Sequence, residues 1–166
     1  MAFELIKIVN DEQLNILASV ANEVWHEFFP CILSDEQIDY MVDKFQSYDA
    51  MKKQMEDGYE YYFLMDNDDI CGYMGIHEEI EEKKMFLSKL YLKKEHRGKG
   101  YAGKTLKKLF DMSIERKLNM VWLTVNKHNE HTIKVYEHMG FAKARTQVAD
   151  IGNGFVMDDY IMEKVL

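Results

Sequence analysis

One stretch of sequence, residues 87–105, most constrains how this chain can fold. It reads LSKLYLKKEHRGKGYAGKT: an apolar, β-favouring run, a charged connector, a loop with two glycines, and the start of an amphipathic helix pattern. Glycines let a backbone approach a ligand closely, and the free N–H groups of a new helix point at whatever negative group lies there. The stretch therefore predicts an anion-binding site, for which a pyrophosphate is the obvious candidate.

The same residues also match a nucleotide-binding motif. Residues 98–105 spell GKGYAGKT, which matches the P-loop pattern G-x-x-x-x-G-K-[ST]. A P-loop should leave its strand almost directly, however, whereas residues 93–97 separate the apolar run from Gly98. The next strand candidate, residues 120–126, ends in Asn126 where a Mg²⁺-binding aspartate would be needed. Too little chain follows for the other strands and crossover helices of a parallel nucleotide-hydrolase sheet.

A second interpretation explains more of the chain. Residues 97–102, RGKGYA, resemble the [QR]-x-x-G-x-[GA] signature of the GCN5-related N-acetyltransferase (GNAT) superfamily, which cradles the pyrophosphate of acetyl-coenzyme A. A second block, NEHTIKVYEHMGF, resembles the family's N-x(6)-Y-x(3)-G-F segment through Asn129, Tyr136, Gly140 and Phe141. Both blocks occur in the expected order, each after a predicted strand and at the start of a helix. The chain therefore resembles a GNAT enzyme.

The resemblance and the hydrophobic periodicity together predict the fold class. We expect an α/β (α+β) GNAT fold, in which a mixed, twisted sheet of six to seven strands is flanked by helices on both faces. A length of 166 residues without a linker predicts a single N-acetyltransferase domain over residues 1–166. The pattern predicts strands at 3–8, 59–65, 70–77, 87–92, 120–125, 142–148 and 155–165, and helices after Asn10 and Ser34 and at 49–56, 102–118 and 130–139.

The resemblance implies acetyl-CoA as co-substrate and a set of donor-binding residues. Backbone N–H groups of the loop would bind the pyrophosphate, basic side chains would add charge at its entrance, and the strand before the loop would pair with the pantetheine arm. Lys99 and Lys104 could equally be surface residues, and Asn129 could equally be a plain helix N-cap. The expected donor-binding residues are Leu90, Tyr91, Leu92, Arg97, Gly98, Lys99, Gly100, Tyr101, Ala102, Gly103, Lys104, Asn129 and Tyr136.

Tyr136 is the expected catalytic residue. In the family the tyrosine of the second block is the usual candidate to protonate the departing thiolate. A phenol with a pKa of about 10 can donate to a thiolate whose conjugate acid has a pKa of about 8.5. The alternative is a core tyrosine that packs beside Ile133 on its helix.

The general base is not evident. Phe86 and Thr124 occupy the two positions where well-known family members carry a glutamate, so both places lack a carboxylate. Three possibilities stay open: another base, an ordered water that deprotonates the amine, or a domain that does not catalyse. We favour the water route. The nearest other bases are Glu79, Glu81, His77 and Asp158.

Charge and resemblance together suggest the acceptor. Lys and Arg total 21 against 29 Asp and Glu, a net charge of -8, which does not support a nucleic-acid partner and favours cationic ligands. Residues 158–164 resemble the C-terminal strand of bacterial spermidine/spermine acetyltransferase-like members. The expected function is transfer of an acetyl group to a primary amine, such as a polyamine. A non-catalytic acyl-CoA-binding module and a P-loop nucleotide binder are the alternatives.

The remaining expectations concern location and surroundings. Cys31 and Cys71 form no cluster with metal-ligand spacing, so we expect no metal site and a reduced, cytoplasmic setting. No signal peptide and no apolar run of membrane-spanning length is visible, so no membrane partner is expected, while a homodimer is compatible with the sequence. Four residues near Pro30 either wall the acceptor site or fill the core edge: Trp25, His26, Phe28 and Phe29.

Overall fold

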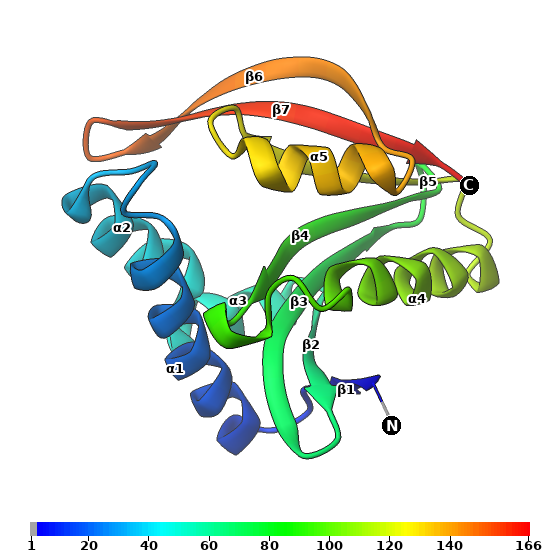
Figure 1. Ribbon diagram of the computed structural model, residues 1–166, viewed down its shortest axis with the longest axis horizontal. Helices are drawn as coiled ribbons and strands as arrows, with labels where there is room; N and C mark the ends of the chain where they lie inside the picture. The colour runs from blue at the N-terminus through cyan, green and yellow to red at the C-terminus, as the bar shows by residue number, and fades with distance from the viewer. Residues whose placement is uncertain (1–2) are drawn as a thin grey trace. The chain divides into compact units, whose positions relative to one another are not determined.

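The computed structural model describes residues 3–166 (Figure 1). The chain forms two compact units. The first comprises the chain up to His77 together with Lys89–Thr105, and the second comprises Glu78–Ser88 together with Leu106–Leu166. Strand β4 (Lys84–Leu92) and helix α4 (Tyr101–Glu115) each contribute residues to both units. The single domain over residues 1–166 stays a prediction.

The first unit contains the antiparallel strands β1 (Phe3–Lys7), β2 (Tyr59–Asp66) and β3 (Asp69–Glu79), in the order β1-β2-β3-β4. A tight turn joins β2 to β3, with Asn67 at a φ of 55°. Asparagine tolerates this left-handed conformation better than most residues, which explains the turn at this position. The predicted hairpin is confirmed.

Three helices follow β1: α1 (Asp11–Phe28), α2 (Asp35–Met41) and α3 (Tyr48–Glu56). The predicted caps are confirmed, since Asn10 forms a capping box with Gln13 and the Ser34 hydroxyl accepts from the Gln37 N–H. A π-helical turn, Val42–Gln46, joins α2 to α3. It was not predicted, because an inserted residue in a helix leaves no periodic signal.

The core of the first unit lies between α1, α3 and the strands. The apolar stripe of α1 packs with Met51 of α3 and with aromatic residues of β2 and β3. Full burial of one such side chain contributes about 1.5–3 kcal/mol. This cluster therefore holds α1 on the sheet. Its buried members are Ile8, Leu14, Leu17, Val20, Ala21, Val24, Met51, Tyr61, Phe63 and Tyr73.

The second unit contains strands β5 (Met120–Asn126), β6 (Ala142–Gly152) and β7 (Phe155–Val165), in the order β4-β5-β7-β6, and helix α5 (Glu130–His138). Strands β4 and β5 pair in parallel, while β7 is antiparallel to both β5 and β6. The seven strands are therefore of mixed direction, and the predicted fold class is confirmed.

The strands of the second unit have two different faces. One face, here called the helix face, carries Val121, Leu123 and Val125 of β5, which are buried. Phe110 of α4 packs on Phe141, Phe141 packs on Tyr136 of α5, and the Lys164 ammonium lies over the Phe110 ring, so α4 and α5 lie on this side. The other face, here called the Trp122 face, carries Trp122, Thr124 and Asn126.

Some boundaries differ from the prediction. Helix α4 covers Tyr101–Glu115, not 102–118, and β6 continues to Gly152, not 148. Most residues of β6 are exposed on both sides, so the alternation that marks a half-buried strand is missing from its sequence.

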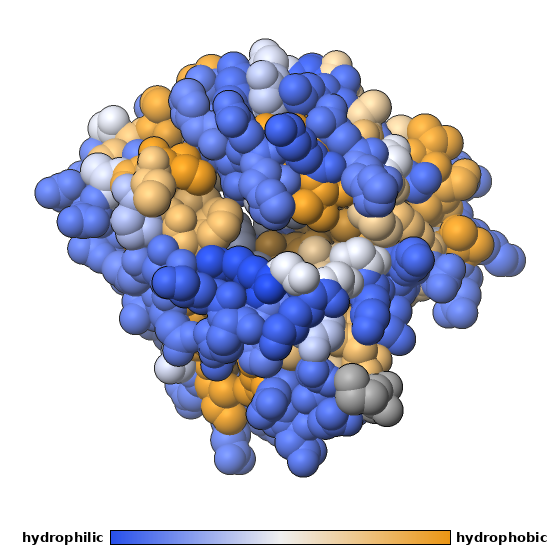
Figure 2. Space-filling model, in the orientation of Figure 1, coloured by the Kyte–Doolittle hydropathy of each residue, from blue (hydrophilic) through white to orange (hydrophobic). Residues whose placement is uncertain are grey.

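Hydrophilic residues cover most of the face shown in Figure 2. Among residues 3–166 no helix has the length and apolarity needed to cross a membrane.

Candidate active site

The glycine loop begins two residues after a short helical turn. Strand β4 ends at Leu92, the 3₁₀ turn Lys94–His96 follows, and α4 starts at Tyr101. The turn separates the strand from Gly98, so the loop does not leave its strand directly as a P-loop would. The local geometry thus favours the GNAT interpretation of these residues.

Six successive backbone N–H groups in this loop are open. In the described part of the chain, the N–H groups of residues 98–103 donate to no backbone carbonyl, and the first helical bond runs from the Lys104 N–H to the Gly100 carbonyl at 3.1 Å. Open N–H groups at a helix start carry partial positive charge, reinforced by the helix dipole. The loop is therefore equipped to bind an anion with several oxygens, as the predicted pyrophosphate site requires.

The two glycines of the loop leave room for such a ligand. Gly98 and Gly100 have φ values of +77° and +83°, a region that residues with a Cβ rarely adopt. A Cβ placed at either glycine would have no protein atom within 4 Å. Glycine is therefore needed here for its backbone conformation, and the adjacent space is open to a ligand.

Replacing Gly100 with alanine should weaken CoA binding about tenfold, because the strained residue costs about 1–2 kcal/mol in the conformation that aims the N–H groups. Gly154→Ala is the matched control: Gly154 has a φ of +78°, equally open surroundings, and lies in the β6–β7 turn. Calorimetric titration with CoA checks the prediction. Similar stability losses but a CoA affinity lowered only in Gly100→Ala are expected, and equal CoA affinity in both variants would contradict it.

Arg97 forms several contacts within the protein. Its guanidinium forms an ion pair with Glu27 of α1, donates to the Leu92 carbonyl at 3.0 and 3.2 Å, and lies 4.7 Å from the Phe28 ring centroid. The charge that was expected at the donor entrance is thus already paired within the protein. The side chain instead ties the loop to the end of α1.

Tyr101 also has a structural contact. Its hydroxyl donates to Asp66 at the end of β2, and its ring stacks on Phe3 at 5.2 Å. The hydrogen bond to Asp66 is the main cause that raises the pKa of Tyr101 to about 12. Lys104 places its ammonium over the Tyr101 and Phe3 rings, at 5.6 and 6.0 Å. These contacts anchor the first turn of α4, while the loop backbone remains free.

The strand before the loop is held by aromatic packing. Tyr91 contacts the rings of Trp25, Phe29 and Tyr73, with centroids 5.4 to 6.0 Å apart. Trp25 and Phe29 are buried in this contact, so for these two the core interpretation holds. Gly72 of β3 lies so close that a Cβ there would be 2.0 Å from the Tyr91 carbonyl oxygen. The side chain of Tyr91 is therefore a packing group that positions its backbone.

Lys89, next to Leu90 in sequence, is buried. Its ammonium donates to the Gln54 side chain at 2.6 Å and to the Tyr61 hydroxyl, and it lies 4.8 Å from the Tyr61 ring. Burial lowers the pKa of Lys89 to about 7. Because neighbouring strand residues point to opposite sides, this group lies on the other side of β4 from Leu90.

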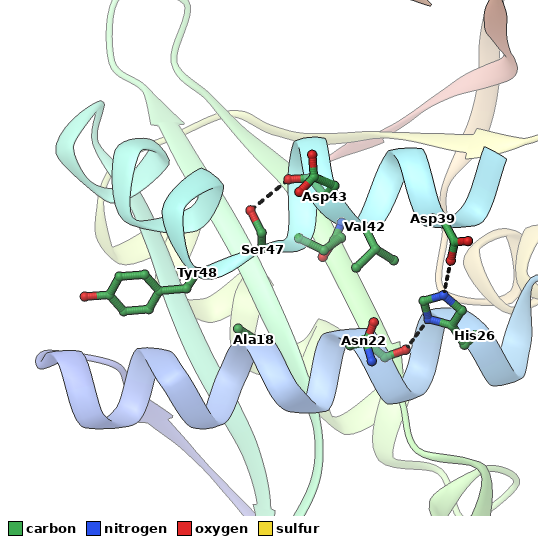
Figure 3. Close-up of a pocket in the computed structure, with 9 residues that line it drawn as sticks. Ala18, Asn22, His26, Asp39, Val42, Asp43, Ser47 and Tyr48 are labelled. Carbon is green, nitrogen blue, oxygen red and sulfur yellow. Dashed lines mark hydrogen bonds and ion pairs between the residues drawn. The ribbon is translucent and has the colours of Figure 1, made fainter. Parts of the chain in front are cut away.

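A cavity of about 400 Å³ lies between α1 and the segment from α2 to α3 (Figure 3). His26 lines it, with Nε2 2.6 Å from an Asp39 carboxylate oxygen and Nδ1 2.8 Å from the Asn22 carbonyl. The hydrogen bond to Asp39 is the main cause that raises the pKa of His26. A ring with both nitrogens held by acceptors favours the cationic form, which is the wrong state for a base. None of the predicted donor-binding residues lines this cavity.

The His26–Asp39 pair should make stability depend on pH. The folded-state pKa lies above the unfolded value of about 6.5, so the stabilisation is fully present below that pH and is lost as pH rises through the folded value. Imidazole NMR titration should show the raised pKa, and Asp39→Asn should bring it down. Asp35→Asn is the control, since its carboxylate is a weaker cause of the same shift. A His26 pKa at or below 6.5 in the unsubstituted protein would refute the prediction.

Helix α5 presents two of the predicted residues. Asn129 occupies the N-cap position and is buried, but its side chain forms no capping hydrogen bond with the helix. Asn129 is therefore the N-cap by position but does not cap the helix with its side chain. Tyr136 is 7% exposed and packs edge-on against Phe141. Burial raises the pKa of Tyr136, so its hydroxyl stays protonated and able to donate.

Most of the other candidate bases predicted from the sequence already contact polar groups of the protein. Glu79 accepts a hydrogen bond from the Trp122 indole at 2.7 Å, and Asp158 lies 2.7 Å from the Lys127 ammonium. His77 lies 3.2 Å from the Asp57 carbonyl. One carboxylate missed by the sequence reasoning is Asp159 on β7, which is buried. No sequence signal marks it, because only strand pairing reveals its surroundings.

Comparison with known proteins places the chain in a family. Residues 18–141 match the model of the acetyltransferase (GNAT) family. The chain belongs to the GNAT family. The matched range includes the glycine loop and the Asn129–Tyr136 block, so the resemblance seen in the sequence is confirmed and the P-loop interpretation is displaced. GNAT enzymes use acetyl-CoA as their donor.

Solved GNAT structures share the fold. The PaiA N-acetyltransferase of Thermoplasma acidophilum, in complex with coenzyme A, is 23% identical over 100% of both chains, with a TM-score of 0.79. A GCN5-related N-acetyltransferase of Rhodopseudomonas palustris is 12% identical over 100% of this chain and 99% of that chain, with a TM-score of 0.80. The spermidine N-acetyltransferase of Vibrio cholerae, in complex with CoA and spermine, is 17% identical over 98% of this chain and 95% of that chain, with a TM-score of 0.71.

Proposed function

We propose that this GNAT protein is an acetyl-CoA-dependent N-acetyltransferase that moves an acetyl group to a small cationic primary amine, such as a polyamine, by direct attack of the amine on the thioester. The observation that carries the proposal is the row of six open N–H groups at residues 98–103, in a chain of the acetyltransferase family. Acetyl-CoA supplies the activated acetyl group and a pyrophosphate for these donors to hold.

The chain's own residues divide the work of holding the donor. The loop N–H groups bind the pyrophosphate, and the side-chain amide of Asn129, which makes no capping bond with α5, is available to the pantetheine arm. The backbone of residues 90–92 pairs with the same arm, and one of its N–H groups polarises the thioester oxygen. Removing one such donor from an oxyanion site typically costs about 3 kcal/mol of transition-state stabilisation.

Tyr136 donates its hydroxyl proton to the departing thiolate. Burial raises the pKa of this phenol, which would weaken it as an acid toward a thiolate in water. The same low-polarity surroundings also disfavour the thiolate and raise the pKa of its thiol. Burial therefore raises the pKa of both the phenol and the thiol, and proton transfer between them remains feasible.

The acceptor assignment rests on charge and on relatives. A net charge of -8 favours a cationic ligand, and a V. cholerae protein of the same fold was solved with spermine. Thiol release from acetyl-CoA, measured across a panel of spermidine, spermine, putrescine, amino acids and peptide N-termini, tests it. Turnover with the polyamines is expected. Turnover only with amino acids or peptides would refute the acceptor class, while leaving the transferase assignment intact.

A non-catalytic acyl-CoA-binding module is the second candidate, because Phe86 and Thr124 stand where related enzymes carry a glutamate. It predicts a rise in Tm with CoA and no thiol release with any amine. The proposed transferase predicts both responses. Stabilisation by ATP with Mg²⁺ and indifference to CoA would overturn both.

A further inference from the structure

The Trp122 face carries a carboxylate that none of these roles uses. Asp159 of β7 is 3% exposed, and its Oδ1 has no hydrogen-bond partner within residues 3–166. Burying a carboxylate without a partner for each oxygen is unfavourable. Such a group in a folded protein needs an explanation, and buried titratable groups of this kind are concentrated at functional sites.

Strand pairing places Asp159 on a defined side of the sheet. It lies opposite Asn126, the last residue of β5, in the antiparallel β5–β7 pair. Directly opposite residues in a sheet point to the same side, so Asp159 shares the Trp122 face with Asn126 and Thr124. Phe86 pairs with Trp122 and stacks on it at 4.2 Å, so it lies on this face as well.

The two positions that lack the expected glutamate, Phe86 and Thr124, therefore lie on the same side as Asp159. Asp159 supplies a carboxylate on that side from the neighbouring strand, at the end where β5 stops. The chain continues from there into α5, and the Lys127 N–H bonds the Asp158 carbonyl at 3.1 Å. The proton donor Tyr136 belongs to the opposite, helix face.

This distribution suits transfer between two molecules. An amine must lose a proton where it enters, and a thiolate must gain one where it leaves. Asp159 and Tyr136 supply a proton acceptor and a proton donor for these two steps. We propose that Asp159 is the general base that deprotonates the acceptor amine, a role that rests on the acetyltransferase function proposed above.

The proton balance closes without another reactant. Asp159 takes one proton from the R–NH₃⁺ acceptor, which becomes R–NH₂. The amine nitrogen bonds to the acetyl carbon, the carbon–sulfur bond breaks, and the sulfur receives the Tyr136 proton. The nitrogen loses its remaining surplus proton to water, the phenolate regains a proton from water, and Asp159 releases its proton to solvent. The products are the N-acetyl amine, free CoA thiol and one proton.

The surroundings of Asp159 adjust its basicity. Burial is the main cause that raises the pKa of Asp159 to about 6, the neighbouring Asp158 raises it further, and Lys127 lowers it. Asn126 of β5 and Gln147 of β6 face it across the ladder and are uncharged. The carboxylate is therefore ionised at neutral pH, yet it is a stronger base than an exposed aspartate.

Asp159→Asn tests the proposal, because it keeps the shape and removes the base. With spermidine as acceptor, kcat/KM should fall about 100-fold or more, while CoA affinity stays unchanged. The unsubstituted enzyme should lose kcat/KM below an apparent pKa near 6, and this acid limb should be absent from the variant. Because the substitution removes a buried, incompletely paired charge, Tm should not fall.

Asp158→Asn is the matched control: a neighbouring carboxylate that is half-exposed and paired with Lys127. It should keep most of the activity and retain an acid limb, which shifts to lower pH because the Asp158 charge helps to raise the pKa of Asp159. An Asp159→Asn variant that keeps the limb or loses less than about threefold in kcat/KM would overturn the general-base role alone. If the variant does not fold, the ¹³C titration of the Asp159 carboxyl in the unsubstituted protein decides, and a pKa below about 4 refutes the role. If the unsubstituted protein releases no thiol with any amine, both this role and the transferase function are overturned.

Discussion

Tyr136→Phe should lower kcat about 10²- to 10⁴-fold, the range by which a positioned proton donor accelerates a reaction. The Kd for CoA should change little, because the ring and its contact with Phe141 are kept and only the hydroxyl is lost. Single-turnover acetyl transfer is the appropriate measurement, since product release can limit kcat and hide a slower chemical step.

Tyr62→Phe is the control for this prediction. Tyr62 is also 7% exposed, but its hydroxyl donates to Glu60 of the same strand, at 2.8 Å. It should lose some stability and keep the single-turnover rate. An unchanged rate in Tyr136→Phe would remove the proton-donor role and favour the alternative in which this tyrosine only packs in the core.

Gly72→Ala should be the most destabilising single-methyl change in the first unit. The added Cβ would lie 2.0 Å from the Tyr91 carbonyl oxygen and 2.9 Å from the Leu92 Cα, both backbone atoms that cannot rotate away. Overpacking typically costs about 1–3 kcal/mol, and a clash between two strands should reach the upper end, lowering Tm by about 6–12 °C. CoA affinity should also fall, because β4 must shift where it leads into the glycine loop.

Gly75→Ala, three residues further along β3, is the matched control. Its Cβ would be 2.7 Å from a carbon of the Tyr61 ring, a side chain that has more freedom to move than a backbone. It should cost less stability and leave CoA affinity nearly unchanged. Urea unfolding and CoA titration of both variants give the comparison. Equal losses in both variants would show that the close approach of β3 to β4 does not position the loop.

Local sequence patterns predicted the elements around the site well. The strand, glycine loop and helix of residues 87–105 are each identified by residues that act within a few positions of one another, as are the Asn10 and Ser34 caps. The missing capping bond of Asn129 could not be predicted, because a capping and a non-capping asparagine look the same in the sequence.

Contacts between residues far apart in the chain could not be predicted from the sequence. Arg97 meets Glu27 across 70 positions, and nothing in either neighbourhood indicates the pairing. Asp159 follows Asp158 in a run that reads as a polar strand end, so its burial depends on the register with β5. Periodicity reports which residues share a face, but it does not report which strand lies beside that face or in what register.

The anchoring of Arg97 has a consequence for how strongly the loop can bind. The residue that precedes Gly98 is tied at once to a carboxylate, an aromatic ring and the carbonyl that ends β4. A flexible loop would have to lose its conformational freedom at the moment of association, and that loss would weaken the complex. Here the loop is ordered during folding, so its amide hydrogens are already in position before the ligand binds. Most of their electrostatic attraction to an anionic ligand therefore contributes to affinity.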